Sequence, residues 1–551
     1  MNFKKIFFFT LFIYLLVNLN IVSQTTNLRL LSIKKNEQQF LNSVSLRSTY
    51  NKSEVASTIA LIQKKIKEKG YFFANLDSIV KRKKEILLHY SLGKKFDSIY
   101  IDTNYLKNDL IIETDKHQPI IKLGIDETQS FLKKQSKLLE DKGYSFSEIK
   151  LNDFKTIENT LYCTLTIQKK IKRKIDKVIY RNYTKFPVSF TNNYFNINKR
   201  TIFNQKKITQ ISNLTKTLKF IEEIKSPEIL FKKDSTLLYL YFKKKQNNSF
   251  DGLVNFASND TGKLNFNGHL DLKLNNVFNN GEKFELFWNS LVNQSQEIKL
   301  ATTQPYIFNS KITPEIQLSI FRQDSLFTNT KFEIKTNYQI KPNSNLRLIY
   351  STTNSSESNN NLDELKSFQN SFFGIGYEFT KFDNAYINDE KIHINLEINF
   401  GKRKTDISTN QIKIESTVSY NYKINARNSI YLKNISGILN SSNYIQNELF
   451  RLGGVNSIRG FLDQSLFANT YSIQNIEYRL LTSRNSYIFS VTDIGFLKNN
   501  QLEEKLIGLG LGFAFTVNNS KIEINSVIGN SLNRKFDFKQ TQLLISWTSF
   551  F

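Results

Sequence analysis

A glycine-rich segment of the chain carries an arginine suited to an ion pair. Residues 450–461 read FRLGGVNSIRGF, so Arg459 is surrounded by Gly453, Gly454 and Gly460. An unpaired charge in a confined space is costly, and Arg459 therefore requires an acidic partner. Phe461 follows the arginine at the end of the segment and is counted with it as part of one motif.

Two carboxylates that follow this segment are the candidate partners. Glu477 lies in the run NIEYR, and Asp493 lies in the run VTDIG, which ends at Gly495. Arginine and carboxylate groups form strong charge-assisted hydrogen bonds. The chemistry expected of this set is an ionic latch that holds a loop in place.

The residues that usually carry catalysis or bind metals are few and scattered. The four histidines stand singly, Cys163 is the only cysteine, and no Gly-x-Ser-x-Gly run occurs. These patterns exclude an internal disulfide and a cysteine-built zinc site, and they disfavour a hydrolase relay. We expect no catalytic residue, no metal and no cofactor, and therefore a protein that is not an enzyme.

The latch residues lie in a region that predicts a β-barrel. Residues 247–551 consist of runs with period-2 alternation, such as Lys331–Tyr338, Ile392–Phe400 and Ile412–Tyr422, separated by turn residues. We count about sixteen runs, and an even number of strands of this length is typical of an antiparallel transmembrane barrel. The arginine segment then falls in the long loop between the eleventh and twelfth strands.

Two runs near the C-terminus support this prediction. Residues 508–515 read GLGLGFAF, which predicts a strand with an apolar lipid face and a glycine-lined inner face. The glycines do not indicate a phosphate-binding loop, because the strand–turn–helix context is missing. The chain ends in alternating residues that include Trp547 and Phe551.

The first half of the chain differs from the barrel region in charge. Residues 24–245 hold 44 Lys and Arg against 22 Asp and Glu, whereas residues 246–551 hold 30 against 27. Residues 1–23 begin with two lysines and continue with a short apolar run, which predicts a signal peptide. Export excludes nucleic acid, so the basic half is expected to meet anionic lipid head groups or acidic clients, or simply to be solvated.

The basic half repeats with a period of 73 residues. The run KGY at Lys69–Tyr71 recurs at Lys142–Tyr144, each time after a helical pattern and before β-like runs. A third helical stripe extends from Ile208 to Ile221. We expect three α+β units at residues 24–92, 93–168 and 169–246, with Gly70 as a helix cap.

These units resemble polypeptide-transport-associated (POTRA) domains, and the arginine segment resembles the loop-six signature of the BamA/TamA superfamily (bacterial surface antigen family). In that family the loop folds into the barrel lumen, and its arginine meets the aspartate of a Phe-x-Asp-x-Gly strand. The resemblance assigns these roles to Arg459 and Asp493, and less securely an acidic role to Glu477. Ile458 stands where valine is usual, and Val491 stands where phenylalanine is common.

Two further segments are similar to features of the same superfamily. Ala301–Tyr306 resembles a proline motif of the fourth strand. A last strand that ends on an aromatic residue resembles the C-terminal insertion signal, which would involve Trp547 and Phe551. The resemblance implies an outer-membrane barrel with periplasmic POTRA units.

Three functions are compatible with this resemblance. The first is a TamA-like or BamA-like factor that inserts unfolded outer-membrane proteins, with outer-membrane lipids and a TamB-like inner-membrane protein or assembly lipoproteins as partners. The alternative is a two-partner secretion transporter for one client. Transporters of that class usually have an N-terminal helix that plugs the pore, but Thr25–Arg47 shows no convincing helix. A passive porin is the third, and the POTRA-like half argues against it.

Overall fold

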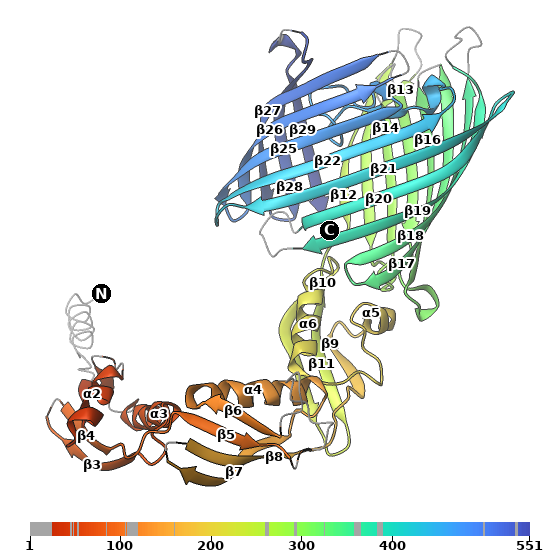
Figure 1. The fold of residues 1–551 in the computed structure, drawn as a ribbon. Coiled ribbons are helices and arrows are strands. Elements are labelled where there is room, and N and C mark those ends of the chain that lie inside the picture. The colour runs from red at the N-terminus through yellow and green to blue at the C-terminus, as the bar shows by residue number, and fades with distance from the viewer. Residues whose placement is uncertain are drawn as a thin grey trace, which may run out of the picture. The chain divides into compact units, whose positions relative to one another are not determined.

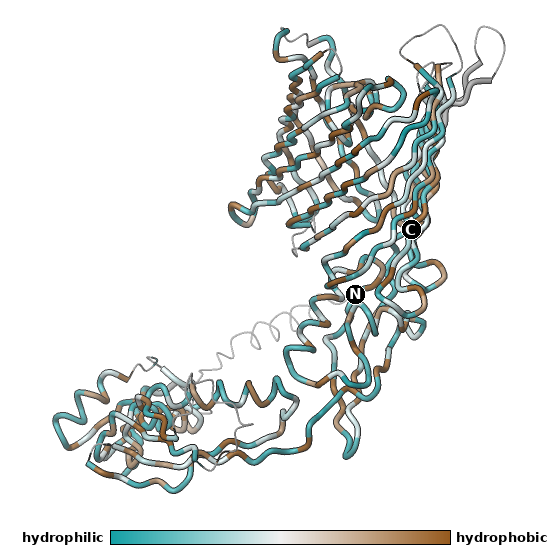
Figure 2. Tube along the Cα trace, turned by 45° about the vertical axis from the view of Figure 1, so that its right-hand side comes forward, coloured by the Kyte–Doolittle hydropathy of each residue, from teal (hydrophilic) through white to brown (hydrophobic). Residues whose placement is uncertain are grey.

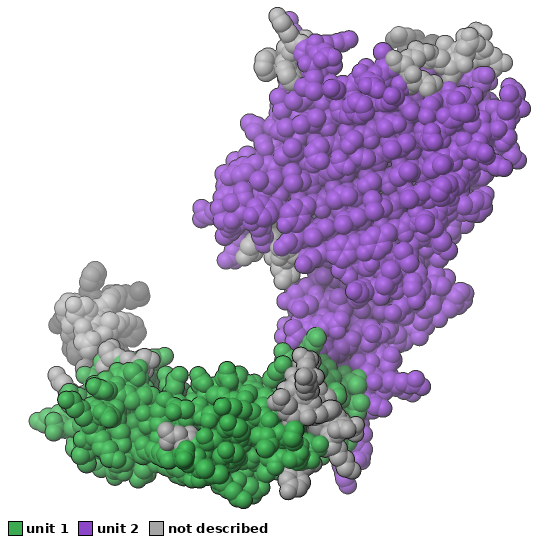
Figure 3. All heavy atoms as spheres, viewed as in Figure 1, with its two compact units in different colours: residues 1–173, 202–206 green, residues 174–201, 207–551 purple. Residues whose placement is uncertain are grey.

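The computed structural model describes residues 25–551 except for a set of short segments. These segments are residues 45–46, 48, 52–53, 84, 105, 107–118, 159, 259–263, 291–294, 324–325, 358–364, 383–389, 500–501 and 535–537. The predicted signal peptide, residues 1–23, lies outside the described residues. Residues 1–173 with 202–206 form one compact unit, and residues 174–201 with 207–551 form a second (Figure 3).

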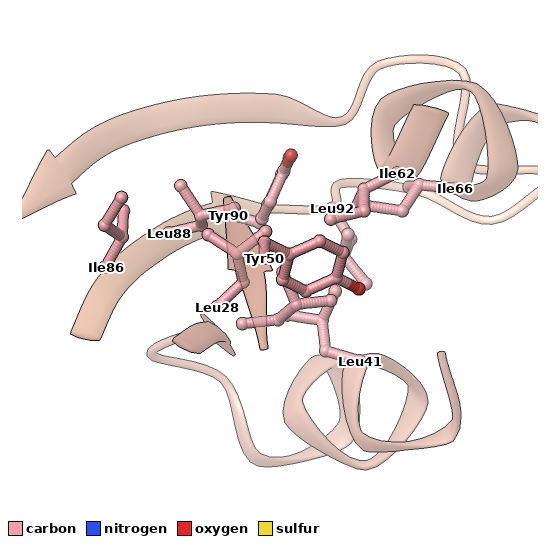
Figure 4. Packing of buried hydrophobic residues seen from close by; sticks show 10 residues of the cluster. Leu28, Leu41, Tyr50, Ile62, Ile66, Ile86, Leu88, Tyr90 and Leu92 are labelled. Carbon is pink, nitrogen blue, oxygen red and sulfur yellow. The ribbon is translucent and has the colours of Figure 1, made fainter. Parts of the chain in front are cut away.

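The first module is a four-stranded sheet covered by two helices. Its sheet has the order β2-β1-β4-β3, with β1 parallel to β4. Its elements are β1 (Thr25–Leu31), α2 (Lys35–Ser43), β2 (Tyr50–Asn51), α3 (Val55–Glu68), β3 (Asn75–Lys81) and β4 (Glu85–Ser91). Figure 4 shows the core between sheet and helices, where Ile62 and Ile66 of the predicted helical stripe are buried.

Helix α2 contradicts the expectation of no helix within Thr25–Arg47. The helix is only nine residues long, and it contains two Asn residues, which are weaker helix formers than Ala or Leu. It is stabilised by packing, because Leu41 lies in the core of the first module (Figure 4). The helix is therefore a part of this module.

The second module repeats the plan of the first. Its sheet has the order β6-β5-β8-β7, and β5 is parallel to β8. Its elements are β5 (Ser98–Asp102), β6 (Ile120–Gly124), α4 (Ile125–Asp141), β7 (Glu148–Ile157) and β8 (Thr160–Gln168). Cys163 of β8 is buried in the core beside Leu161 and Leu165.

The repeated glycines occupy equivalent positions in the first two modules. Gly70 and Gly143 have φ angles of +98° and +91°, which a side chain would disfavour. The carbonyl of Gly70 accepts a hydrogen bond from the amide of Phe96 at 2.9 Å, and that of Gly143 accepts one from Arg173 at 2.9 Å. Each glycine therefore ends one helix and accepts a hydrogen bond from the backbone that follows the last strand of its own module.

The third module shares a compact unit with the barrel. Its sheet has the order β10-β11-β9. Its elements are β9 (Lys177–Asn182), α5 (Val188–Asn193), α6 (Gln205–Thr215), β10 (Ile221–Phe231) and β11 (Thr236–Lys244). The expected helical stripe through Ile221 was too long, because Ile221 pairs with Lys244 in the sheet. None of the helices among the described residues is long and apolar enough to cross a membrane.

The C-terminal region forms a closed antiparallel barrel of sixteen strands, as predicted (Figure 1). The strands are β12 (Ser249–Ser258), β13 (Leu264–Asn275), β14 (Lys283–Ser290), β15 (Ser295–Thr303), β16 (Ile312–Gln323), β17 (Phe327–Lys341), β18 (Ser344–Glu357), β19 (Phe368–Phe382), β20 (Glu390–Lys404), β21 (Ser408–Lys423), β22 (Asn428–Ser441), β25 (Thr470–Ser483), β26 (Ser486–Lys498), β27 (Glu503–Val517), β28 (Ser520–Ser531) and β29 (Gln542–Phe550). Figure 2 shows apolar and polar residues alternating along them.

The alternation places apolar side chains on the outside of the barrel. In β27, Leu509, Leu511 and Phe513 are exposed. Between them, Gly510 is half-buried and Gly512 is buried. In β20, Leu396 is exposed and its neighbour Glu397 is buried. An apolar outer band is the surface that a transmembrane barrel presents to lipid.

The barrel closes through a short seam. Strand β12 pairs with β29 at only two positions, Ser249 with Phe550 and Phe250 with Ser549. Asn248 and Phe551 add two backbone hydrogen bonds at the same end. By contrast, β12 pairs with β13 over ten positions and β28 pairs with β29 over eight. Few hydrogen bonds therefore need to break for the barrel to open here.

Candidate functional site

The arginine segment forms a hairpin between β22 and β25. Two short strands, β23 (Phe450–Leu452) and β24 (Leu466–Ala468), pair with each other and form its stem. Gly453, Gly454 and Gly460 all have positive φ angles and shape the tip of the hairpin. We call residues 453–461 the tip.

Arg459 at the tip contacts Asp493 of β26 through three hydrogen bonds. Its backbone N and its Nε both donate to Oδ2 of Asp493, at 2.9 Å and 2.8 Å, and its Nη2 donates to Oδ1 at 2.7 Å. Asp493 has no exposed surface, and Arg459 is 5% exposed. The expected contact is therefore bidentate and buried, the geometry in which an arginine–carboxylate pair is strongest.

Glu477 of β25 joins the same contact and extends it. Its Oε1 accepts a hydrogen bond from Arg459 Nη1 at 2.6 Å, and its Oε2 accepts two from Arg479, at 2.8 Å and 2.6 Å. Burial would lower the pKa of the Arg459 guanidinium, but hydrogen bonds to Asp493 and the charges of both carboxylates raise it above its ordinary value. We call Arg459, Asp493 and Glu477 the latch.

Arg479 was not anticipated from the sequence. It lies two residues after Glu477 on the same strand, so both side chains face the lumen. Its guanidinium also lies 4.0 Å from the centre of the Tyr431 ring. The spacing of Glu477 and Arg479 was the signal that could have identified it.

The glycines of the neighbouring strands allow the tip to approach the barrel wall. A Cβ atom on Gly508 of β27 would overlap the carbonyl of Arg459, and one on Gly529 of β28 would overlap Gly460. Gly495 of β26 lies against Ile458, where a Cβ would come within 2.8 Å of the isoleucine side chain. The glycine-lined face of β27 is thus partly covered by the loop.

Apolar packing supports the ionic contacts. Ile458 is fully buried in a cluster with Leu452 and Ala468 of the hairpin and with Leu497 and Leu506 of the barrel wall. Phe461 packs against this cluster and is partly buried. The tip is therefore held both by charge and by apolar burial.

The remaining predicted residues lie away from the latch. Trp547 is an outward, exposed residue of β29, and Phe551 follows that strand at the seam. Tyr306 of the Ala301–Tyr306 segment lies in the turn after β15. The centre of its ring lies 4.8 Å from the centre of the Phe190 ring of the third module. Among the described residues, no group of histidine, cysteine or acidic side chains has the arrangement of a metal site.

A family model matches a part of the barrel. Residues 315–515, which include the latch, match the family model of haemolysin secretion/activation proteins ShlB/FhaC/HecB. A search of curated proteins finds no match.

Solved structures with a similar fold include two CdiB proteins. CdiB from Escherichia coli is 12% identical, with 90% of this chain and 98% of that chain covered and a TM-score of 0.53. CdiB from Acinetobacter baumannii is 14% identical, with 78% and 83% covered and a TM-score of 0.52. BamA from Haemophilus ducreyi lacking POTRA domains 1-3 is 12% identical, with 82% and 98% covered and a TM-score of 0.46. The two CdiB matches show that this chain shares the fold of those proteins.

Proposed function

We propose that this protein is an outer-membrane transporter that secretes a polypeptide client through its barrel. The observation that carries the proposal is the match of residues 315–515 to a family of haemolysin secretion/activation proteins, because the matched region contains all three latch residues. The sequence alone favoured an assembly factor. The family match favours the secretion transporter over the assembly factor, and we do not propose that the protein is TamA-like.

The proposal places the apolar band of the barrel in the outer membrane and the three modules in the periplasm. The modules would receive the client before it enters the lumen. Each sheet ends at an edge strand, β3, β7 or β10, and an edge strand is suited to pairing with an extended segment. The excess of positive charge in residues 24–245 favours acidic clients or anionic lipid head groups.

The latch has a structural role in this proposal and no catalytic one. It fixes the loop of residues 442–469 between β22 and β25, which we call loop six, against β25 and β26. The lumen thereby keeps one defined shape at the bilayer. The polar groups of the loop are satisfied inside the barrel, which a loop in contact with lipid could not achieve.

The second candidate function is insertion of outer-membrane proteins. The two-residue pairing of β12 with β29 favours it, because a client strand could add to these edges when the seam opens. A TamB-like inner-membrane protein or assembly lipoproteins would be partners only in this case.

Depletion of the protein followed by quantitative proteomics separates the two functions. The transporter predicts the loss of one or a few secreted proteins while the outer-membrane proteome is unchanged. A simultaneous fall of many barrel proteins would instead support the assembly factor. Complementation with Arg459→Ala tests the latch, and the exposed Arg484→Ala, in the turn between β25 and β26, is the matched control.

A further inference from the structure

Loop six contacts the barrel wall in three separate sectors. The tip lies against β25 to β28, as described above. The loop's root, Asn447 and Glu448, lies against β17, β18, β20 and β21. Residues 462–464, which we call the crossing arm, reach β14 and β15. The loop therefore extends across the lumen from one part of the wall to another.

The root is fixed by a second buried ion pair. Arg403 of β20 contacts Glu448, and both side chains are 1% exposed. Gln411 of β21 donates to Glu448 at 2.8 Å, and Asn447 donates to the hydroxyl of Ser355 at 2.7 Å. Removal of one partner of such a pair would leave a buried charge uncompensated, so the root is a fixed point.

The crossing arm makes fewer contacts with its wall. Gln464 Nε2 donates to Glu297 Oε2 of β15 at 2.6 Å, and Asn289 Nδ2 of β14 donates to Asp463 Oδ2 at 3.3 Å. Neither contact is an ion pair. The tip, in contrast, has four hydrogen bonds between Arg459 and two carboxylates.

Two features of the arm oppose its closed position. Gln464 has a φ of +54°, a left-handed conformation that is unfavourable for a residue with a side chain. Asp463 lies near Glu297, and burial together with this like charge raises the pKa of Asp463, although Lys299, His269 and Arg451 act in the opposite direction. The arm is held closed against local strain and repulsion.

The arm also forms part of the wall of a cavity in the lumen. This cavity, of about 480 Å³, is lined on one side by Asp463, Gln464 and the hairpin, and on the other by β14 to β19, β21 and β22. Its lining includes Glu297, the residue that the arm contacts. Withdrawal of the arm would therefore enlarge the lumen without any change at the latch.

We propose that the crossing arm is a releasable strap that closes the lumen against β14 and β15, and that it opens while the tip and the root stay attached. This inference rests on the proposed function and deepens it, because it names the element that admits the client. Gln464 and Glu297 are positioning residues in this scheme. The strap opens by movement of three residues, whereas movement of the tip would break the buried latch.

Reversible cross-links in the full chain test the strap. The only native cysteine, Cys163, is first replaced by alanine. The arm pair is Glu297→Cys with Gln464→Cys, and the matched tip pair is Ser457→Cys with Asn475→Cys, whose native residues are joined by a 2.9 Å hydrogen bond. A short bis-methanethiosulfonate reagent links each pair, and a reductant releases it, so each protein serves as its own reference.

Conductance across a planar bilayer is the first readout, because it requires no client. We expect cross-linking of the arm pair to lower conductance about tenfold relative to the reduced protein, and cross-linking of the tip pair to change it little. Equal conductance of the arm pair in both states would overturn the strap. A tenfold loss of conductance on linking the tip pair would overturn the strap as well, because it would mean that the tip must move for the lumen to open.

A charge variant gives a second test without a cross-link. Gln464→Glu adds a carboxylate beside Glu297 and Asp463, and we expect it to raise the open fraction and the mean conductance. Gln369→Glu adds the same charge at an exposed position of β19 and is the control. An unchanged conductance for Gln464→Glu would count against the strap.

The strap and the proposed function fail in different experiments. If linking the arm changes conductance while depletion alters no secreted protein, the strap stands and the transporter function is wrong. If depletion removes a secreted client but the linked arm still exports it at the wild-type rate, the transporter stands and the strap is wrong.

Discussion

Asp493 accepts three hydrogen bonds from a single residue, Arg459, and has no surface exposed to solvent. One of the three comes from the backbone of Arg459, so the aspartate fixes the path of the loop as well as its side chain. A lysine at this position could reproduce the charge but not the bidentate contact. The pair therefore determines where the tip of loop six lies.

Removal of the arginine from the latch should weaken the barrel. Arg459→Ala leaves Asp493 buried without its charged partner and removes one of the three hydrogen bonds that Glu477 accepts. Breaking a buried pair costs about 3–5 kcal/mol. We expect the temperature at which the barrel loses its heat-modifiable mobility in gel electrophoresis to fall, while the modules remain folded. Arg484→Ala should leave that temperature unchanged, and a wild-type temperature for Arg459→Ala would argue against the latch.

A side chain at Gly508 should displace the tip although every latch residue keeps its own side chain. The added Cβ of Gly508→Ala would overlap the backbone carbonyl of Arg459, which cannot rotate away. We expect faster proteolysis of loop six in the full-length protein. Gly376→Ala is the control, since its Cβ would come no closer than 3.1 Å to a neighbouring atom. Equal proteolysis of the two variants would contradict the close approach.

The glycines at positive φ predict a difference between two similar substitutions. Gly70→Ala adds a side chain at a positive φ and also overlaps the carbonyl of Phe96, whereas Gly93→Ala at φ +72° meets its nearest neighbour only at 3.7 Å. Strain alone costs about 1–2 kcal/mol. We therefore expect Gly70→Ala to destabilise the first two modules more than Gly93→Ala does, as measured by urea unfolding. A similar loss in both would mean that the site of Gly70 tolerates the side chain.

The first module should lose stability in acid through Glu37. Burial would raise the pKa of this carboxyl, but hydrogen bonds from Ser32 and Leu92 and the charge of Lys34 lower it overall. A lowered pKa in the folded state means that the stabilisation is present above the ordinary value, about 4.3, and is lost as the pH falls through the folded value. Hydrogen exchange of α2 and β4 should accelerate below this range.

The control for this effect is Glu37→Gln, which carries no titrating group. The variant should show faster exchange at neutral pH and a smaller change on acidification. If its exchange responds to acid as strongly as the wild-type protein does, another group is responsible.

Local patterns determined the barrel and much of the latch. Side chains of a strand alternate between two environments, so period-2 runs such as Ile392–Phe400 revealed the sixteen strands, and turn residues revealed their ends. A charged Arg459 among glycines required a partner, and only a few carboxylates followed it closely. The repeated KGY runs likewise marked the ends of helices α3 and α4, because the positive φ at such an end favours glycine.

The tertiary structure decided what these patterns leave open. Helix α2 exists because Leu41 is buried by residues distant in sequence, which no local pattern reveals. Arg403 and Glu448 are separated by a full strand pair, and Gln464 and Glu297 are separated by seven strands of the barrel, so only closure of the barrel brings each pair together. The seam depends on the register of the first and last strands, and register is set by the whole sheet and not by either strand alone.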